Sequence, residues 1–312
     1  MMFVSNKTRS LWNPTLSLLR SGTASFEKAP VHWRFTELTI PKIPMAFVEC
    51  RLTFAGVEAV GLGDSVFFKK AAIKALAEAW ERAWMRKLYE GGRVEIKSSN
   101  GFAAGRTAQD AVMSARAECA ERAIFLSAWE QQRGWQGVSC KGVAANLLLS
   151  FLSQRAWKTS FYRIDGGSTG QVVAGLSVHP EFGAVFDTKF AGSVADASCF
   201  KGLVRSLLRM AIVQERIGVD KTFTLAESAA PFDHMKFYRD PEHLKAFDFL
   251  RGIDATQSLD FDSGEKGRTN CEILCDVSEL PAVAYAYNNQ WPMLQWGTKA
   301  IRGKNNWPHP LA

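Results

Sequence analysis

Two segments of this chain are predicted to form long helices, and both contain the same seven-residue frame. Residues 67–89 and 107–131 contain neither glycine nor proline, which indicates uninterrupted helices. The frame Ala-Glu-x-x-Glu-Arg-Ala, called here the acidic frame, occurs at residues 77–83 and again at 117–123. Glutamates three positions apart lie on one face of a helix. The chain must therefore fold around two helices that each present a pair of carboxylates.

Placing the two acidic frames together would concentrate four negative charges. Two carboxylates ~4 Å apart repel by about 4 kcal/mol at an effective dielectric constant of ~20, so such a cluster must be separated, protonated or neutralised by cations. Mg²⁺ prefers oxygen ligands and is usually shared between carboxylates and substrate phosphates. The repeated frame therefore favours a metal and nucleotide site. A solvated, salt-bridged helix face is the alternative interpretation of either frame taken alone.

Segments with alternating apolar and polar residues predict the strands. They lie at 46–54, 93–99, 160–165, 171–178, 184–190, 271–277 and 282–288. Further helices are predicted at 142–155 and 199–217, and Thr107 with Asp110 resembles a capping box that opens the helix at 107–131. Strands interleaved with long helices indicate an α+β or α/β fold with mixed sheets packed under helices.

Glycine-rich and polar stretches predict the connections between these elements. Residues 56–65 are expected to form a turn, with Asp64 or Ser65 as the N-cap of the first long helix. Residues 100–105 are expected to be a glycine-bearing loop, and residues 219–268 loops and short helices.

Length and composition restrict the class of protein. With 312 residues, 47% hydrophobic and 22% charged, the chain can bury a substantial core, and no apolar run approaches the ~18 residues of a membrane helix. Residues 1–45 are expected to be an irregular N-terminal extension before a main domain at 46–312. Asn6, Asn13 and Pro14 interrupt any signal-peptide core, so we expect a cytoplasmic protein without a membrane partner.

Charge and reactive residues exclude several other functions. The net charge of +7 is dispersed without a long basic block, which argues against a nucleic-acid partner and fits an acidic peptide or ATP. The six cysteines are scattered, so a disulfide framework is not expected. The five histidines show no paired metal-ligand spacing, and Ser98 and Ser99 lack the frame of a hydrolase nucleophile.

Several of these stretches resemble the YcaO family of ATP-using enzymes. Residues 74–82 resemble its Ser-x-x-x-Glu-x-x-Glu-Arg pattern, and residues 98–123 resemble its Ser-Asn-Gly-x-x-Ala-Gly loop leading into a second Glu-x-x-Glu-Arg helix. Residues 61–72 resemble the family's Gly-Lys-Gly segment, and residues 202–216 resemble its third helix. Near the end of the chain, residues 292–297 resemble the Leu-Gln-x-x-Phe-Gly segment of azoline-forming members, and residues 308–312 resemble their proline-rich terminus. The resemblance extends from about residue 46 to the C-terminus.

The resemblance implies a YcaO-like α+β fold with an internally repeated ATP-binding helix motif, and ATP and Mg²⁺ as cofactors. The implied metal ligands are Glu78, Glu81, Glu118 and Glu121. The implied ATP-binding residues are these four with Lys74, Arg82, Asn100, Ser114, Arg122 and Arg216. The implied catalytic residues are Pro308, Pro310 and Ala312, whose terminal carboxylate would handle protons. Structural ion pairing is the alternative role of both frame arginines, and a disordered end is the alternative for the tail.

In the family's reaction a nucleophile adds to a backbone amide carbonyl, the oxyanion takes the γ-phosphate of ATP, and phosphate leaves. The resemblance therefore implies a cyclodehydratase subunit that forms thiazolines or oxazolines in a ribosomally made precursor peptide, in bacteriocin-like natural-product biosynthesis. Peptide thioamidation and an inactive scaffold subunit are the alternatives. Its expected partners are the precursor peptide, a leader-binding subunit related to ubiquitin-activating enzymes and, optionally, a flavin-dependent dehydrogenase, in a homodimer or hetero-oligomer.

Four positions depart from the family pattern. Lys74 replaces a serine, Leu62 replaces the lysine of Gly-Lys-Gly, Arg209 occupies an acidic position, and Ala312 replaces the last proline. Lys74 can still contact phosphate, and all four glutamates of the acidic frames are present. These facts favour an active, divergent enzyme over an inactive scaffold.

Overall fold

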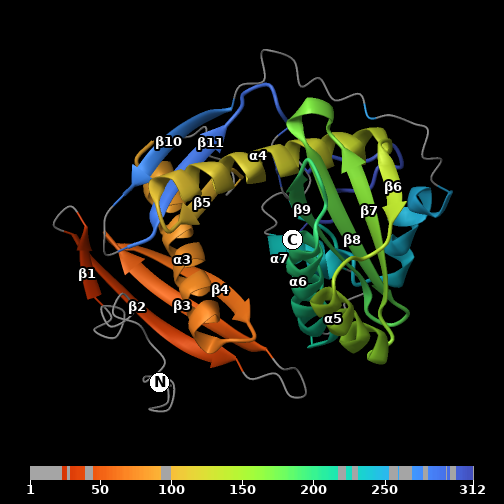
Figure 1. The fold of residues 1–312 in the computed structure, drawn as a ribbon, viewed down its shortest axis with the longest axis horizontal. Helices are drawn as coiled ribbons and strands as arrows, with labels where there is room; N and C mark the ends of the chain where they lie inside the picture. Colours follow the sequence, from red (N-terminus) through yellow and green to blue (C-terminus); the bar gives the residue numbers. More distant parts are fainter. Residues whose placement is uncertain are drawn as a thin grey trace. The chain divides into compact units, whose positions relative to one another are not determined.

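The computed structural model describes two compact units (Figure 1). The described residues are 23–26, 29–38, 45–92, 100–216, 223–226, 231–252, 259, 269–276, 280–292, 294–295 and 300–311. Unit 1 comprises Met1–Glu118 and Thr269–Tyr287, and unit 2 comprises Cys119–Arg268 and Asn288–Ala312. Helix α4 (Ala108–Gln131) belongs to both, because the division falls within the second acidic frame.

Unit 1 contains a four-stranded antiparallel sheet covered by helix α3 (Phe68–Glu90). Its strands, in sheet order, are β1 (Thr23–Phe26), β2 (Ala29–Leu38), β3 (Ala46–Phe54) and β4 (Val57–Ser65). The strands β3 and β4 meet in a two-residue turn, in which Ala55 and Gly56 have φ of 49° and 81°. Positive φ at both positions is typical of the tight hairpin turns that match the twist of the strands.

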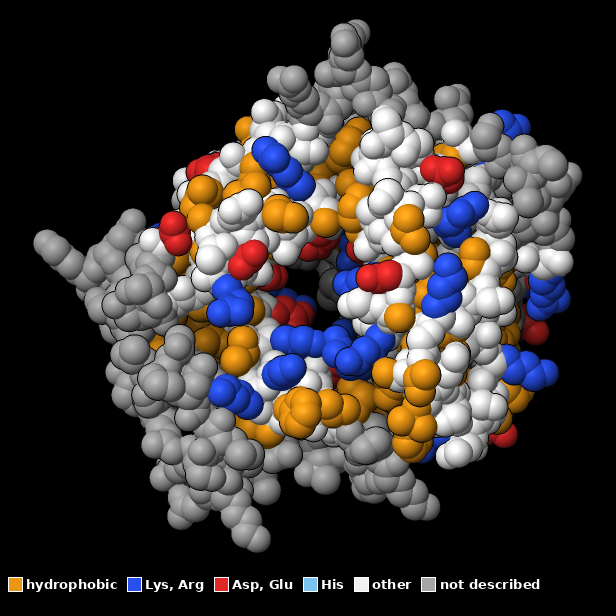
Figure 2. Space-filling view, viewed as in Figure 1, with side chains coloured by type: hydrophobic (Ala, Val, Ile, Leu, Met, Phe, Trp, Pro, Cys, Tyr) orange, Lys and Arg blue, Asp and Glu red, His pale blue; other side chains and the backbone are white. Residues whose placement is uncertain are grey.

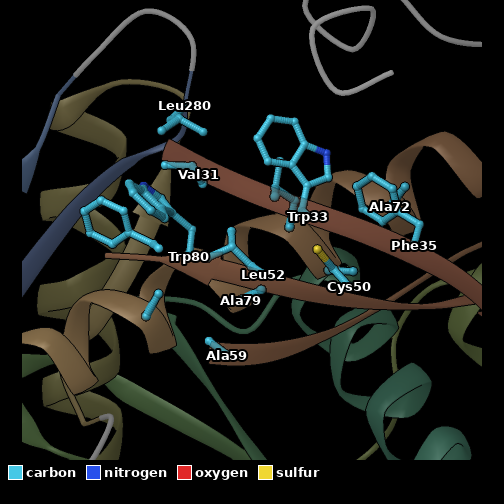
Figure 3. Close-up of a cluster of buried hydrophobic side chains, with 14 of the residues drawn as sticks. Val31, Trp33, Phe35, Cys50, Leu52, Ala59, Ala72, Ala79, Trp80 and Leu280 are labelled. Carbon is cyan, nitrogen blue, oxygen red and sulfur yellow. The ribbon is translucent and has the colours of Figure 1, made fainter. Parts of the chain in front are cut away.

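The core of unit 1 lies between this sheet and α3 (Figure 3). The aromatic and aliphatic side chains of β2 and β3, among them Trp33 and Leu52, pack against Trp80 and the alanines of the helix. Glycines in β4 let the helix backbone approach closely, because a Cβ atom at Gly61 or Gly63 would lie 2.1 Å from Ala75 O or 1.8 Å from Ala71 O. The first acidic frame is thus held directly against β4.

Three predictions for this region are wrong. Residues 56–65 form strand β4 instead of a turn, because their alternating glycines serve close packing against α3. The expected N-cap also fails, since Phe67 occupies the cap position without a side-chain hydrogen bond. Residues 29–38, expected to be irregular, form strand β2, which pairs with β3 from Val31 to Leu38. The division into an extension at 1–45 and a main domain at 46–312 stays a prediction.

A second sheet of unit 1 consists of β10 (Asn270–Cys275), β11 (Ala282–Tyr287) and β5 (Phe102–Gly105). The predicted loop at 100–105 is therefore largely a strand, whose pairing partner β11 lies far along the chain. Gly101, with φ of 79°, allows the turn before β5 to pass within hydrogen-bonding distance of Ala286. The predicted strand at 93–99 lies outside the described residues.

Unit 2 is built on a second four-stranded antiparallel sheet. Its strands, in sheet order, are β6 (Trp135–Val138), β7 (Lys158–Asp165), β8 (Gln171–His179) and β9 (Gly183–Gly192). Its helices besides α4, among the described residues, are α5 (Val143–Gln154), α6 (Ala197–Arg216), α7 (Pro231–Phe237) and the 3₁₀ helices η1 (Gly167–Thr169) and η2 (Pro241–Gly252). Strand β8 is buried on both faces, with Val172 and Ala174 in the core formed with α4 and Gly175 against Leu207 of α6.

The surface of unit 2 includes an uncharged α-helix. Helix α5 contains no charged residue, and its Val143 and Leu147 side chains are exposed. Figure 2 shows hydrophobic side chains at the place of this helix. None of the helices among the described residues combines the length and hydropathy that a membrane span requires.

The α+β class predicted from the sequence is confirmed. Among the described strands every pairing is antiparallel, so the sheets are antiparallel where mixed sheets were expected. The helices predicted at 67–89, 107–131, 142–155 and 199–217 are confirmed as α3, α4, α5 and α6. The predicted start of α4 is also confirmed, because the Asp110 N–H donates to Thr107 Oγ1 at 3.1 Å.

Candidate functional site

The first acidic frame lies on α3 and is bonded to strand β4. Glu78 Oε2 accepts the Leu62 N–H at 2.7 Å, and Glu78 Oε1 lies 2.6 Å from Arg82 Nη2. Arg82 in turn donates from Nη1 to Val60 O at 2.7 Å. The contact to Leu62 uses its main chain, so the departure from the family's lysine at this position does not remove it.

Glu81, the second glutamate of this frame, is bonded to a different sheet. Its carboxylate accepts the N–H of Ala104 in β5. Burial raises the pKa of Glu81 to about 8, and the negative charges of Glu118 and Glu78 add to the increase. Glu118 and Glu78 are therefore both close enough to Glu81 in unit 1 to repel its charge, and the metal site predicted for all four glutamates stays a prediction. A cation would relieve this repulsion.

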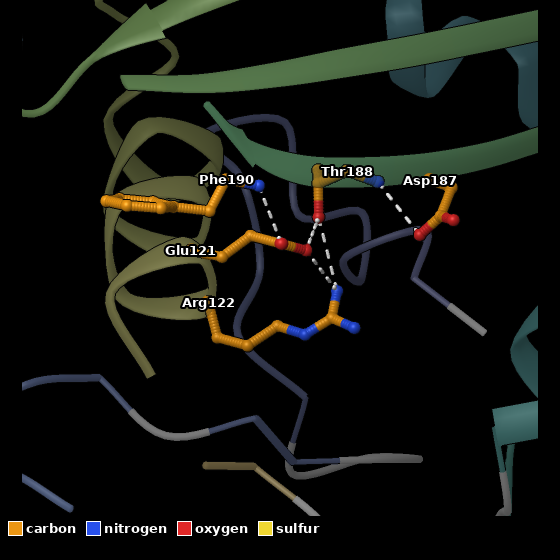
Figure 4. Close-up of polar contacts among 5 residues, drawn as sticks. All are labelled: Glu121, Arg122, Asp187, Thr188 and Phe190. Carbon is orange, nitrogen blue, oxygen red and sulfur yellow. Dashed lines mark hydrogen bonds and ion pairs between the residues drawn. The ribbon is translucent and has the colours of Figure 1, made fainter. Parts of the chain in front are cut away.

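Glu121 of the second frame is bonded to β9 in unit 2 (Figure 4). Its Oε1 accepts the Thr188 hydroxyl at 2.7 Å, and its Oε2 accepts the Phe190 N–H at 2.8 Å. Arg122 Nη1 lies 3.5 Å from Glu121 Oε1 and donates to Thr188 Oγ1 at 3.2 Å. The Glu121 carboxylate thus ties α4 to β9 and orients a neighbouring guanidinium. Sequence spacing gave no signal for Thr188.

The other predicted ATP-binding residues are dispersed over the two units. In unit 1, Lys74 is an exposed residue of α3 whose Nζ donates to Asp64 O at 3.1 Å. Asn100 is buried two residues before the start of β5, and Ser114 is exposed on α4. In unit 2, Arg216 is the exposed last residue of α6. The roles of these four residues stay predictions.

The C-terminal segment is buried in unit 2. Pro308, His309, Pro310 and Leu311 are all buried, so the alternative of a disordered end is wrong for these residues. The His309 ring donates from Nε2 to Gln295 O at 2.6 Å, which brings together the two C-terminal segments that resemble the family. Ala312 lies outside the described residues, and the catalytic role of Pro308, Pro310 and Ala312 stays a prediction.

The donor set is compatible with a shared magnesium ion. Among the residues that the structure describes, no three histidine, cysteine, aspartate or glutamate side chains are gathered closely enough to hold a metal by themselves. Mg²⁺ usually takes one or two protein carboxylates and completes its shell with phosphates and water. The mutually repelling Glu81 and Glu118 have the oxygen chemistry that such an ion requires.

The chain is similar to known proteins both in sequence, through a family model, and in fold. Residues 83–277 match a family model described as YcaO cyclodehydratase, ATP- and Mg²⁺-binding. This range includes the second acidic frame and starts at the last residue of the first, so Glu78 and Glu81 lie outside it. No curated protein matches the chain.

Solved structures of similar fold include three relevant cases. The YcaO protein of Methanopyrus kandleri, bound with AMPPCP and Mg²⁺, has a TM-score of 0.56 and 14% identity over 91% of this chain and 90% of its own. The E. coli microcin synthetase McbBCD complex with pro-MccB17 bound has a TM-score of 0.56 and 11% identity over 81% of this chain and 86% of its own. A heterocyclase in complex with substrate and cofactor has a TM-score of 0.57 and 12% identity over 81% of this chain, which spans about half (49%) of the heterocyclase.

Identities this low establish a shared fold alone, whereas the family model covers more than half of the chain. The model's description confirms the predicted cofactors, ATP and Mg²⁺, at the level of the family. This chain belongs to the YcaO family.

Proposed function

We propose that this chain uses ATP and Mg²⁺ to activate backbone amides of a ribosomally made precursor peptide and forms thiazolines or oxazolines. The observation that carries the proposal is the Glu81 carboxyl, whose pKa is raised to about 8 by burial first and by the negative charges of Glu118 and Glu78 in addition. Three neighbouring carboxylates that are only partly exposed are costly to keep ionised without a cation that compensates their charge. Family membership supports Mg²⁺, bound with ATP, as that cation.

The glutamates of the two frames have different proposed roles: some bind the metal, and others bind neighbouring strands. We assign Glu81 and Glu118 as metal ligands, with Glu78 next to them. Both oxygens of Glu121 are engaged by β9, but each carboxylate oxygen has two lone pairs, so a further bond to a metal remains open. When bound, Mg²⁺ and ATP would supply charge neutralisation and the phosphoryl group.

The arginines and the tail have proposed roles at the phosphates and the amide. The Arg122 guanidinium, which Thr188 and Glu121 orient, suits a phosphate oxygen because its planar fork matches that geometry. A cysteine, serine or threonine side chain of the peptide would attack the preceding carbonyl, and the amide oxygen would leave as phosphate. The peptide then loses one water for each ring. We place the C-terminal carboxylate of Ala312 at the proton transfers.

The partners proposed for this reaction are a precursor peptide and further subunits. The E. coli microcin synthetase, which shares the fold, is a complex with pro-MccB17 bound. By analogy we propose a leader-binding subunit related to ubiquitin-activating enzymes, with a flavin-dependent dehydrogenase as an optional third component. Thioamidation remains the second candidate reaction, because the same amide activation with sulfide as nucleophile would exchange oxygen for sulfur.

The first test measures ADP release from Mg-ATP by the full chain. We expect Glu81→Gln, Glu78→Gln and Glu121→Gln each to lower ADP release at least ~100-fold, because each removes a negative charge from the proposed metal site. Glu130→Gln, at an exposed position of helix α4, which also carries Glu121, is the matched control and should retain wild-type turnover. Wild-type ADP release in all three variants would reject the metal assignment.

The second test identifies the product by mass spectrometry. The substrate is a short peptide rich in cysteine, serine and threonine encoded beside the gene for this chain, incubated with Mg-ATP and the neighbouring subunits. Loss of water supports azoline formation, and replacement of oxygen by sulfur supports thioamidation. An unmodified peptide with no ADP release would support the inactive scaffold instead.

A further inference from the structure

We infer that Trp129, Tyr238 and His234 are positioning residues that hold the C-terminal tail, defined as residues 307–311, at a fixed place on helix α4. The inference rests on the proposed function in one respect, namely that the tail takes part in the reaction. All three residues lie in unit 2 with the tail. None of the three was singled out by the sequence patterns.

Three consecutive carbonyl groups of the tail each accept a hydrogen bond from a buried side chain. Trp129 of α4 donates from Nε1 to Trp307 O at 3.2 Å. Tyr238, directly after α7, donates its hydroxyl to Pro308 O. His234 of α7 donates from Nδ1 to His309 O at 2.9 Å, and the two histidine rings stack with centroids 4.8 Å apart. Donors from separate segments therefore converge on one short stretch of backbone.

The chemistry of the tail explains why side chains are needed. Pro308 and Pro310 have no N–H, so this stretch cannot join a sheet through a regular ladder of hydrogen bonds. The described main-chain contacts are an isolated bridge between Arg302 and Pro308 with flanking hydrogen bonds. Buried carbonyls require partners, and the tail carbonyls receive them from indole, phenol and imidazole groups. These donors determine where the tail lies.

The same helix connects the tail to the second acidic frame. Trp129 follows Glu121 by eight residues on α4, or about 12 Å along a rigid helix at ~1.5 Å per residue. The pKa of His309 is lowered to about 3, mainly by burial and further by the nearby charges of His234 and Arg122. The tail histidine therefore lies close enough to Arg122 for their charges to interact. The three donors thus fix the tail to the element that carries Glu121 and Arg122.

The first experiment measures hydrogen exchange of tail amides and does not depend on activity. The His309 N–H donates to Ile301 O at 3.0 Å and the Gly303 N–H to Trp307 O at 2.9 Å, so both amides report release of the tail. We expect Trp129→Phe and Tyr238→Phe to accelerate their exchange about fivefold or more, because each removes one donor and keeps the ring. His234→Asn, which retains a donor, should exchange more slowly than His234→Leu.

Trp135→Phe is the matched control for this experiment. Trp135 belongs to the same core cluster as Trp129 and also donates its Nε1 to a backbone carbonyl, but the acceptor is Ala128 and not the tail. Trp135→Phe should change the hydrogen-exchange rates of the His309 and Gly303 amides no more than those of reference amides in β8. Equal exchange at these two amides in the Trp129, Tyr238 and Trp135 variants would overturn the inference.

The second experiment measures peptide product and ADP in the full chain and in a chain lacking residues 308–312. In the full chain we expect Tyr238→Phe to lower kcat for ring formation and leave KM for ATP unchanged. In the shortened chain the same substitution should have no further effect. If Tyr238→Phe lowers kcat by the same factor in the shortened chain as in the full chain, Tyr238 acts independently of the tail, and the inference is overturned.

The two experiments separate this inference from the proposed function. If the wild-type chain forms no ring while Trp129→Phe and Tyr238→Phe release the tail, the proposed function fails and the positioning role stands. If rings form but tail exchange is unchanged, the positioning role fails and the function stands. Should the shortened chain be unfolded by circular dichroism, the exchange result alone decides.

Discussion

The two acidic frames have the same sequence pattern but different surroundings. In the first, Arg82 pairs with Glu78 one turn away, and their side chains are 43% and 30% exposed. In the second, Arg122 lies against Glu121 and Thr188, and the side chains of this arginine and glutamate are only 17% and 6% exposed. The Arg82–Glu78 pair of the first frame therefore lies closer to solvent than the Arg122–Glu121 pair of the second, which is embedded between a helix and a sheet.

The difference shows what a helical motif leaves to its neighbours. Both frames place glutamates on one helix face, and in both a glutamate accepts the backbone N–H of an adjacent strand. Close glycine packing brings β4 to Glu78, whereas a hydroxyl and a backbone amide of β9 bring Glu121 to its place. The strand that packs on each helix thus determines how strongly each carboxylate is linked to the fold.

The largest contrast is expected when each frame loses one glutamate. Glu121→Ala should lower the free energy of unfolding by about 4 kcal/mol, because it leaves Thr188, Phe190 N–H and the Arg122 charge without their buried acceptor. Glu78→Ala should cost about 1 kcal/mol, because its partners are nearer to solvent. Urea unfolding measures both, with Glu130→Ala as the exposed control. Equal losses would remove the contrast.

A change in β4 should disturb the first frame without touching its side chains. Gly63→Ala would put a Cβ 1.8 Å from Ala71 O and 2.6 Å from Ala75 N, and the helix backbone cannot yield locally. We expect a loss of about 3 kcal/mol in the free energy of unfolding. The control is Gly137→Ala in β6, where a Cβ would meet nothing within 4 Å. Similar stabilities of the two variants would contradict close packing as the anchor of this frame.

The free energy of unfolding should decrease at acidic pH because of His309, the tail histidine near Arg122 of the second frame. Burial, with His234 and Arg122, lowers the pKa of His309 to about 3, whereas a histidine in an unfolded chain titrates near pH ~6.5. Below that pH the unfolded state takes up a proton that the folded state does not, so stability falls as the pH falls. Between pH ~6.5 and ~4.5 this group should remove about 2.5 kcal/mol.

Urea unfolding at several pH values checks the sign and the origin of this effect. His309→Gln keeps a donor for Gln295 O but cannot take up the proton, so its stability should fall less steeply with decreasing pH than that of the wild type. An identical pH dependence in the two proteins would show that His309 is not responsible.

The smallest effect is expected at the arginine of the first frame. Arg82→Met should lower the free energy of unfolding by about 0.5 kcal/mol, since an ion pair this exposed gains little in water. The difference from the wild type should shrink when salt is raised from ~0.1 to ~1 M, because salt screens exposed charges. A loss above ~2 kcal/mol that is independent of salt would show that Arg82 is as embedded as Arg122.

Local features of the sequence predicted the helices and the position of the glutamates well. The stretches 67–89 and 107–131 form α3 and α4 because glycine and proline are absent and helix-forming residues follow one another. Glu78 and Glu81 lie one turn apart on α3, as their spacing predicted, and Glu118 of α4 lies close enough to Glu81 to raise its pKa. Spacing alone did not show that Glu121 would bond to Thr188, because that contact joins residues far apart in the chain.

The errors fall where a residue's role depends on a distant partner. Glycine at positions 61 and 63 is a turn signal by itself, and only the approach of α3 makes these residues part of a strand. The short segment 102–105 becomes a strand because β11 pairs with it. The prolines of the tail suggested an open end until Trp129, Tyr238 and His234 supplied donors for its carbonyls.

The sequence by itself determined two long helices, their paired carboxylates and the family to which the pattern is similar. These properties follow from backbone preferences and spacings within a few residues, which are present before the chain folds. The tertiary structure decided which strand each glutamate binds, how deeply each is buried and where the tail lies. Those properties depend on hydrogen bonds between distant residues and on the loss of water around them. The paired strands β5 and β11, for example, are about 180 positions apart in the sequence, and only the packed fold brings them together.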